Sequence, residues 1–473
     1  MRRFGFSLAL VLTAAAASAG IETAHREALR GLVADLEGLA KWCTKSKLFA
    51  DRNRTYAVLL DFDPDHAVAR KWLGYRRLHG GWVRRGPYRQ PRNHAERKHE
   101  EFQSRLAAVG QGFGDRIAAV VEASGSRASI AQSRALRDVF KIAPNHERVR
   151  ALNGQRLHRG RWMLEETIGS LKRRRLLART ARRVLSEIPE PRATGLYPDE
   201  ANIGVPWTGA AHTTSWRVVS TTSKRERHAS ARVAAATVDL FEDVFETVVK
   251  PRRGQVLFVV TDHDQFTRVL LRHPTGSAEQ ARKEAKRGST WMPQTSHVVV
   301  WSSKAYERVE FAARQPLGSL MQRNFGITTK HGWAWEGFGL YLSELLTGTH
   351  TTHFVRSTRY AEKEKSQDDA LWREIRDPDS NWFWVCRGLA KSNGLAELHY
   401  LLQKDVNAMT GEDLIYSYVF AAYLLEAHPE KTPDILRAIG KEEVPFHDAI
   451  PKALGMDLNA LQERVNAWVI ERQ

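Results

Sequence analysis

The stretch of sequence that decides the fold is His331–Leu342, which reads HGWAWEGFGLYL in one-letter code. It lies in the part of the chain, from Ala305 onward, where nearly every segment has the periodicity of a helix. Its one acidic residue, Glu336, stands among aromatic side chains. The run therefore predicts an apolar helix that carries a single carboxylate.

This segment resembles the third-ligand helix of the gluzincin zinc peptidases, whose pattern is roughly Trp-x-x-Glu-Gly-x-Ala-x-Tyr. The pattern is matched by Trp333, Glu336, Gly337 and Tyr341. Gly339 stands where alanine is usual. The resemblance covers roughly residues 213–473 and implies a gluzincin-like domain, with a small mixed sheet and a helical C-terminal half.

The resemblance also implies a His-Glu-x-x-His motif about 20 residues before Glu336. In that motif two histidines on one helix face bind zinc, and the glutamate is the general base. The matching window holds Gln315, Pro316 and Ser319 in place of these three residues, and the chain contains no His-Glu-x-x-His. We therefore expect the fold without the zinc or the catalysis. The vestigial site would consist of Gln315, Pro316, Ser319, Glu336 and Tyr341.

A metal site could be rebuilt only from residues with unusual spacing. The candidates are Glu336, His331, His350 and His353. Their spacing matches no standard zinc site, so no cofactor is expected, although zinc on this set stays open as an alternative. The chain also lacks a Gly-x-Ser-x-Gly elbow, a P-loop and a Gly-x-Gly-x-x-Gly fingerprint.

Alternating strands and helices precede the decisive segment. Strands are predicted at Ser215–Thr221, Gln255–Val260 and His297–Trp301, and helices at Arg227–Val249 and Asp264–Leu271. Pro316 is expected to start a further helix. The pattern predicts an α+β fold, with a metallopeptidase-like domain over residues 213–350 and a helical subdomain over residues 351–473.

A tandem repeat lies in the first half of the chain, because residues 64–82 and 144–162 align without a gap at an offset of 80. The shared positions are Pro64/Pro144, His66/His146, Arg70/Arg150, Gly74/Gly154, Arg76/Arg156, Gly80/Gly160 and Trp82/Trp162. Each copy predicts a helix that starts at the proline and ends at the first glycine, then a tight turn into a short strand. The two histidines are expected to cap or pack the helix start. The repeat resembles helical modules found ahead of enzyme-like domains in exported bacterial proteins, which implies scaffolding.

These features divide the N-terminal half of the chain. Residues 20–185 are predicted to form a helical region that contains both repeats. Residues 186–212 are rich in proline and glycine and have weak periodicity, so they are predicted to be an interdomain linker.

The first 19 residues are predicted to be a secretory signal peptide. Arg2 and Arg3 precede the apolar run Phe4–Ala17, and Ala17-Ser18-Ala19 is a small-x-small cleavage pattern. The alternative, a membrane anchor, would need about 20 apolar residues. We therefore expect export to the periplasm or the extracellular space, with no transmembrane segment in the mature chain.

The composition is that of a basic globular protein. The chain has 473 residues, 42% of them hydrophobic, and a formal net charge of +18. Its two cysteines exclude a disulfide-stapled scaffold. The charge favours anionic surfaces such as cell-envelope polymers. The candidate binding residues are Lys172, Arg173, Arg174 and Arg175. Aromatic residues are sparse there, so nucleic acid is not an expected partner.

Three functions stay open at the level of sequence. The first is an inactive peptidase-like protein that binds a protein or peptide in the old cleft, with Trp333 and Trp335 lining the groove. The second is a basic envelope scaffold that binds anionic polymers. The third is an active hydrolase with non-standard metal ligands.

Overall fold

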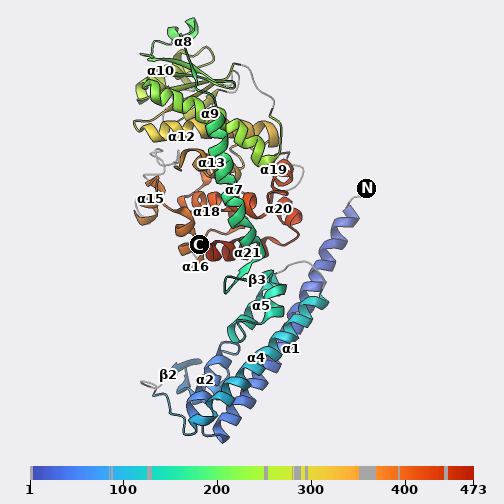
Figure 1. Ribbon diagram of the computed structural model, residues 1–473. Coiled ribbons are helices and arrows are strands. Elements are labelled where there is room, and N and C mark those ends of the chain that lie inside the picture. The colour runs from blue at the N-terminus through green and yellow to red at the C-terminus, as the bar shows by residue number, and fades with distance from the viewer. Residues whose placement is uncertain are drawn as a thin grey trace. The chain divides into compact units, whose positions relative to one another are not determined.

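The computed structural model shows a mostly helical α+β protein that divides into two compact units (Figure 1). One unit comprises Met1–Glu165 with Gly455–Ala460, and the other Glu166–Leu454 with Leu461–Gln473. The structure describes residues 4–84, 86, 89–124, 130–249, 254–279, 281, 289–292, 297–350, 369–392, 395–441 and 446–472. Within these residues no helix has the length and apolarity that a membrane crossing requires.

The first unit is a tandem duplication of one module. The first copy contains α1 (Phe4–Lys45), α2 (Phe49–Leu60), α3 (Ala67–Trp72), β1 (Tyr75–Leu78) and β2 (Gly81–Arg84). The second copy contains η1 (Glu96–Lys98), α4 (His99–Ala123), α5 (Ile130–Ile142), α6 (Glu147–Leu152), β3 (Gln155–His158) and β4 (Arg161–Leu164). The last three elements of each copy recur 80 residues apart, and a long helix and a shorter one precede them in both. The repeat is therefore longer than its matched sequence.

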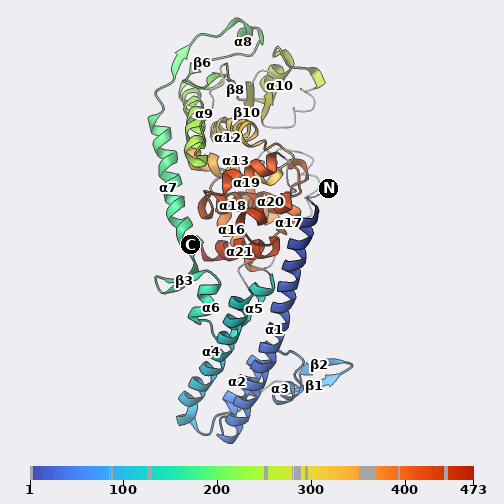
Figure 2. The same cartoon turned by 90° about the vertical axis from the view of Figure 1, so that its right-hand side faces the viewer.

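Long helices from both copies form the core of this unit. Leu32 and Leu36 of α1 are fully buried in one cluster with Phe113 and Ile117 of α4. Each pair is four residues apart, so both side chains of a pair lie on one face of their helix. Figures 1 and 2 show α1 and α4 running side by side.

The repeated histidines cap the short helices, as predicted. Nδ1 of His66 accepts a hydrogen bond from the Ala69 amide at 3.2 Å, and Nδ1 of His146 accepts one from the Val149 amide at 3.3 Å. Each histidine is the N-cap residue of its helix. Pro64 lies before the cap, so the histidine rather than the proline marks the helix start.

The second unit is built on a six-stranded sheet with the order β5-β6-β7-β8-β10-β9. The strands are β5 (Arg192–Thr194), β6 (Gly209–His212), β7 (Arg217–Ser220), β8 (Val256–Val260), β9 (Ser289–Met292) and β10 (His297–Trp301). β7, β8 and β10 are parallel, and β5, β6 and β9 pair antiparallel with their neighbours. The three predicted strands are thus confirmed as the parallel centre of the sheet.

The prediction of a linker over residues 186–212 is wrong, because β5, β6 and α8 (Pro198–Asn202) lie within it. A buried ion pair holds this segment to the sheet, with Arg217 donating to both carboxylate oxygens of Glu200 at 2.6 and 2.7 Å. Strands of three or four residues are too short to produce a measurable sequence period, and the glycines and prolines mark turns between them.

Helices cover both faces of this sheet. α9 (Lys224–Phe245) and α12 (Ala305–Phe325) pack on one face, and α10 (His263–Arg272) packs on the other. Figure 2 shows the two helices together on their side of the strands. α7 (Glu165–Glu187), predicted as part of the N-terminal region, belongs to this unit, where Trp468 donates to Ser170 Oγ at 2.8 Å.

The rest of the second unit is helical. Its elements are α13 (Gly332–Thr347), α15 (Asp369–Arg376), α16 (Trp382–Lys391), α17 (Leu398–Leu401), η3 (Val406–Ala408), α18 (Gly411–Ala427), α19 (Thr432–Gly440), α20 (Phe446–Leu454) and α21 (Leu458–Glu471). α13 packs closely on α18, since a Cβ at Gly337 would lie 2.3 Å from the Ser417 carbonyl oxygen. The predicted division between residues 350 and 351 is therefore not a boundary between compact units.

Candidate functional site

Glu336 is buried between α12 and α13 and is paired with an arginine. Its side chain is almost fully covered, and Nη2 of Arg314 donates to its Oε2. A buried carboxylate without a partner would cost several kcal/mol, and the guanidinium supplies the compensating charge. The unpaired carboxylate that the lost motif implied is thus replaced by an ion pair between two helices.

The window that matched the lost motif lies in the middle of α12. Pro316 is inside this helix and not at its start, so that prediction is wrong. Proline lacks an amide hydrogen, and α12 continues past it with one intrahelical hydrogen bond fewer. Gln315 is half-buried, and Ser319 is buried with no hydrogen-bond partner for its Oγ in the described part of the chain.

The partner of Glu336 allows a second alignment of the sequence with the His-Glu-x-x-His pattern. If Arg314 is placed at the general-base position, Ala313 and Leu317 take the places of the two histidines. Neither side chain has a lone pair to offer a metal. In both registers the positions therefore lack two of the three zinc ligands and the base.

The aromatic residues of α13 belong to the packing of the helix pair. Trp333 is fully buried, and its ring lies 5.2 Å from that of Phe420. Trp335 is half-buried and lies against α12, where a Cβ at Gly318 would come within 2.7 Å of the indole ring. The expectation that Trp333 lines an open groove is therefore wrong.

Tyr341 belongs to a different buried network. Its hydroxyl donates to Glu426 Oε1 at 2.5 Å, and Arg472 pairs with the same carboxylate. Burial raises the pKa of Tyr341 well above its usual value, and the charge of Glu426 raises it further. Tyr341 therefore supports the packing of α13 on α18 and does not act with Glu336.

The histidine candidates do not converge on Glu336. His331 precedes α13, where its Nδ1 accepts from the Thr328 amide at 3.0 Å, and His350 follows the other end of this helix. A 16-residue helix is about 24 Å long, so the two rings are too far apart to share an ion. His353 lies outside the described residues. Among the residues described, no group of three or more His, Cys, Asp or Glu could hold a metal ion.

His350 packs against an aromatic ring and has an acidic neighbour. Its ring lies 4.4 Å from that of Trp382, and its Nδ1 is 3.6 Å from Glu344 Oε2. Burial lowers the pKa of His350 to about 4, so the imidazole is neutral at physiological pH. Burial also raises the pKa of Glu344.

The basic stretch predicted to bind anions lies on α7. Lys172, Arg174 and Arg175 are exposed, and Arg173 is half-buried. The Arg174 guanidinium lies 5.1 Å from the centre of the Phe383 ring. This one of the four basic side chains therefore also makes a cation–π contact within the protein.

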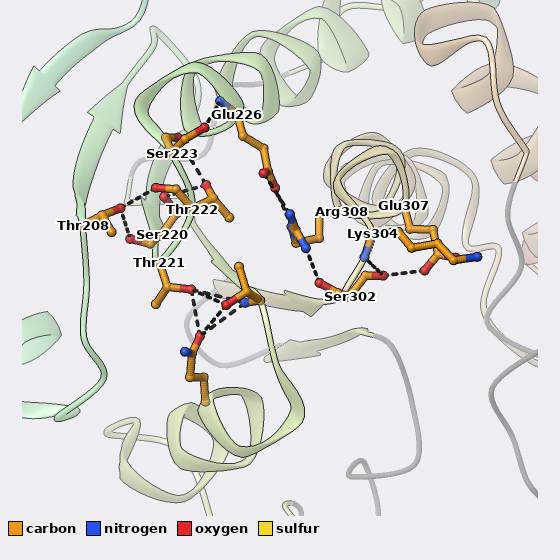
Figure 3. Close-up of polar contacts among 12 residues, drawn as sticks. Thr208, Ser220, Thr221, Thr222, Ser223, Glu226, Ser302, Lys304, Glu307 and Arg308 are labelled. Atoms are coloured by element: carbon orange, nitrogen blue, oxygen red, sulfur yellow. Dashed lines mark hydrogen bonds and ion pairs between the residues drawn. The ribbon is translucent and has the colours of Figure 1, made fainter.

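A polar cluster that the sequence did not indicate lies at the carboxyl ends of the parallel strands (Figure 3). The residue after β7, Thr221, donates to Gln265 Oε1 at 2.8 Å and accepts from the amide of Thr261, which follows β8, at 3.2 Å. Ligands of open α/β sheets commonly bind at this edge. The one feature of the sequence that could have indicated this cluster is the threonine or serine that directly follows each of the three parallel strands.

A second bridge at this edge joins two helices of the same face. Arg308 of α12 pairs with Glu226 of α9 and also donates to the carbonyl of Ser302, which follows β10 (Figure 3). Ser302 Oγ accepts from the Lys304 amide at 3.0 Å. This edge therefore holds two groups of polar side chains, and the buried charge of Arg308 is compensated by Glu226.

The two hairpins of the first unit are exposed and basic. Neither Tyr75–Arg84 nor Gln155–Leu164 contains an acidic residue. Their exposed arginines are Arg76, Arg77 and Arg84 in the first and Arg156, Arg159 and Arg161 in the second. Positive φ angles at His79 and Gly80, and at Arg159 and Gly160, give both hairpins the type I′ turn.

A tryptophan fixes each hairpin to the module. The indole of Trp82 donates to Asp65 at 3.0 Å, and that of Trp162 donates to Asn145 at 3.2 Å. Asp65 and Asn145 directly precede the capping histidines. Each copy therefore presents a hairpin of the same backbone form with three exposed arginines, and only Arg76 and Arg156 occupy equivalent positions.

Comparison with known proteins assigns no family to the chain, because no family model, no curated protein and no solved structure matches it.

Proposed function

We propose that this chain is an exported, catalytically inactive peptidase-like protein that acts as a binding or scaffolding module. The observation that carries the proposal is the buried pair of Arg314 with Glu336. The Glu336 carboxylate accepts a hydrogen bond from the Arg314 guanidinium inside the interface between two helices. The guanidinium therefore occupies the place where a metal ion would bind this carboxylate. A metal would have to displace that cation in the same small space.

The surrounding residues support the same reading. Each alignment of the proposed vestigial site puts residues other than histidine at the two histidine positions, and the candidate histidines His331 and His350 lie beyond the two ends of α13. The proposed ligand of this unit is a protein or peptide. Exposed aromatic residues such as Trp384 and Tyr400 offer the type of anchor that protein interfaces favour.

The test is the metal content and peptidase activity of the purified chain without its first 19 residues. After dialysis without chelator, elemental analysis is expected to give less than about 0.1 zinc per chain. Added zinc is expected to produce no peptide hydrolysis. Close to one zinc per chain, lost in the variant Glu336→Gln, would contradict the proposal and favour the hydrolase with non-standard ligands.

A second candidate function is binding of an anionic envelope polymer, and the repeated hairpins favour it. Six exposed arginines on two acid-free hairpins give the first unit two similar cationic surfaces. Polyanion binding through such contacts weakens steeply with salt, because each contact releases counterions.

Binding to dextran sulfate, measured at several salt concentrations, tests this second function. The variants Arg76→Ser with Arg77→Ser, and Arg156→Ser with Arg159→Ser, are each expected to lower the slope of log K against log salt by about 1 to 2. The matched control is Lys172→Ser with Arg175→Ser on α7. Loss of slope in the control alone would assign binding to α7 and contradict a role for the hairpins.

A further inference from the structure

Among the described residues of the second unit, one buried cation has no acidic partner. Arg227, in the first turns of α9, is 6% exposed. Its Nη1 donates to Thr208 Oγ1 at 2.9 Å, and its Nε has no hydrogen-bond partner. Within the described ranges no carboxylate pairs with it.

Arg227 differs in this respect from the other buried arginines of the unit. Their pairs are Arg217 with Glu200, Arg308 with Glu226, Arg314 with Glu336 and Arg472 with Glu426. Arginine keeps its proton at physiological pH, so a buried guanidinium without a counter-charge is destabilising. Burial alone lowers the pKa of Arg227, with no neighbouring acid to oppose it.

The guanidinium lies beside the backbone that enters α9. Thr208 Oγ1, its hydrogen-bond partner, is 3.0 Å from the Ser220 carbonyl and 2.5 Å from the Thr222 carbonyl, as Figure 3 shows. The next residue, Ser223, caps α9 by accepting from the Glu226 amide. Arg227 is thus next to the N-terminus of a 22-residue helix, whose dipole favours an anion.

The protein makes room for this cation. The guanidinium lies over Gly209, where an added Cβ would be 3.3 Å from the guanidinium carbon. Thr208 is exposed, so the group lies just below the surface. The first helical residue, Lys224, is an exposed cation on the same turn. The acid of this turn, Glu226, is already neutralised by Arg308.

We propose that Arg227 and the N-terminus of α9 form a binding site for a small oxyanion, specifically a phosphate group. The planar guanidinium and the helix N-terminus both match phosphate, and the bound anion supplies the counter-charge that the protein lacks. This site is independent of the proposed function, because it lies at the sheet edge and not between α12 and α13.

The test compares thermal unfolding of the wild type and Arg227→Met in a low-salt buffer without phosphate, and then with added inorganic phosphate. The wild type is expected to gain at least about 3 °C in Tm at saturating phosphate. Arg227→Met is expected to unfold at the same or a higher Tm than wild type without phosphate, and to lack the specific gain. Phosphate also stabilises proteins by exclusion from their surface, so the difference between the two chains is the readout.

Arg225→Met, an exposed change on the same turn, is the matched control and is expected to keep most of the phosphate response. If Arg227→Met does not fold, Arg227→Gln replaces it, and calorimetric titration of phosphate into each chain gives the affinity directly. Phosphoserine and inorganic phosphate are compared to distinguish a phosphomonoester from the free ion as the natural source. An equal phosphate response in wild type and the Arg227 variant, or an equal response to acetate, would overturn the proposal.

Discussion

At the scale of single residues, the pairing of Arg314 with Glu336 determines the chemistry of the space between α12 and α13. The sequence placed Glu336 on a helix correctly, but its partner comes from another helix 22 residues earlier. A contact of this kind depends on how two helices rotate against each other, which periodicity alone does not specify. The sequence-based alignment placed Pro316 at the general-base position, two residues after Arg314, so Arg314 was not among the candidate residues.

The pair of Arg314 and Glu336 also leads to a prediction about the stability of the chain. Arg314→Met is expected to destabilise the chain by about 3 kcal/mol or more, because it leaves the Glu336 carboxylate buried without a counter-charge. The double variant Arg314→Met with Glu336→Leu removes both charges and is expected to recover most of that loss. Urea unfolding of the wild type and both variants measures this. A double variant as unstable as the single one would show that packing, not charge, dominates the site.

A second residue-scale prediction concerns the loss of stability at acidic pH. His273 Nε2 lies 2.7 Å from His297 Nδ1, and burial, together with the charge of His297, lowers the pKa of His273 to about 4. The unfolded chain binds this proton near pH 6.5, so the contribution to stability is complete above pH 6.5. It is lost as the pH falls toward 4, by about 3 kcal/mol.

The decrease in Tm between pH 7 and pH 4.5 measures this dependence. His273→Gln is expected to show a smaller decrease than the wild type. His350, whose pKa is also lowered to about 4 by burial, contributes a similar dependence, so a residual slope is expected in the variant. An unchanged slope in His273→Gln would mean that the pair is not a source of acid sensitivity.

At the scale of elements, long apolar or periodic stretches of sequence were sufficient to predict a strand or a helix, whereas stretches of three or four residues were not. The uninterrupted apolar run Val256–Val260 identified β8, whereas the starts of α3 and α6 lie at the capping histidines and not at the prolines that were expected to start these helices. Residues 192–194 and 209–212 form strands only because neighbouring strands and the Arg217–Glu200 pair hold them. Such tertiary stabilisation has no counterpart in the local sequence.

The close approach of α13 and α18 gives an element-scale prediction. Gly337→Ala is expected to destabilise the chain by about 1–3 kcal/mol, because its Cβ would lie 2.3 Å from a backbone oxygen of α18. Gly339→Ala on the same helix is the control. Its nearest neighbour would be at 3.7 Å, and alanine favours helix over glycine by up to about 1 kcal/mol. Chemical denaturation of both variants measures whether α13 and α18 are in contact at Gly337. Equal stability of the two variants would contradict the close contact.

At the scale of the whole molecule, the chain combines a duplicated module with a sheet-and-helix unit. The boundary between them falls at residues 165 and 166, and not in the proline-rich segment that the composition favoured. Proline and glycine mark turns in either setting, so composition does not separate a linker from short strands and turns inside a folded unit.

Export is a prediction for the whole molecule. Expression in a bacterial host is expected to give a mature protein that begins at Gly20, because Ala17 and Ala19 fit the small positions of a signal-peptidase site. Intact mass and N-terminal sequencing of the exported fraction measure this. Ala19→Arg is expected to block cleavage. An intact Met1 or Arg2 terminus in the wild type would contradict the prediction.

The duplication of the capped hairpin has a consequence for how this protein can change over time. In each copy the histidine cap, the turn glycine and the tryptophan anchor maintain the fold, whereas the outward residues of the strands take no part in a core. The outward residues of one copy can therefore change while the fold of both copies is kept. A protein with this arrangement tolerates substitutions on one hairpin surface without a new fold and without a change in the other hairpin.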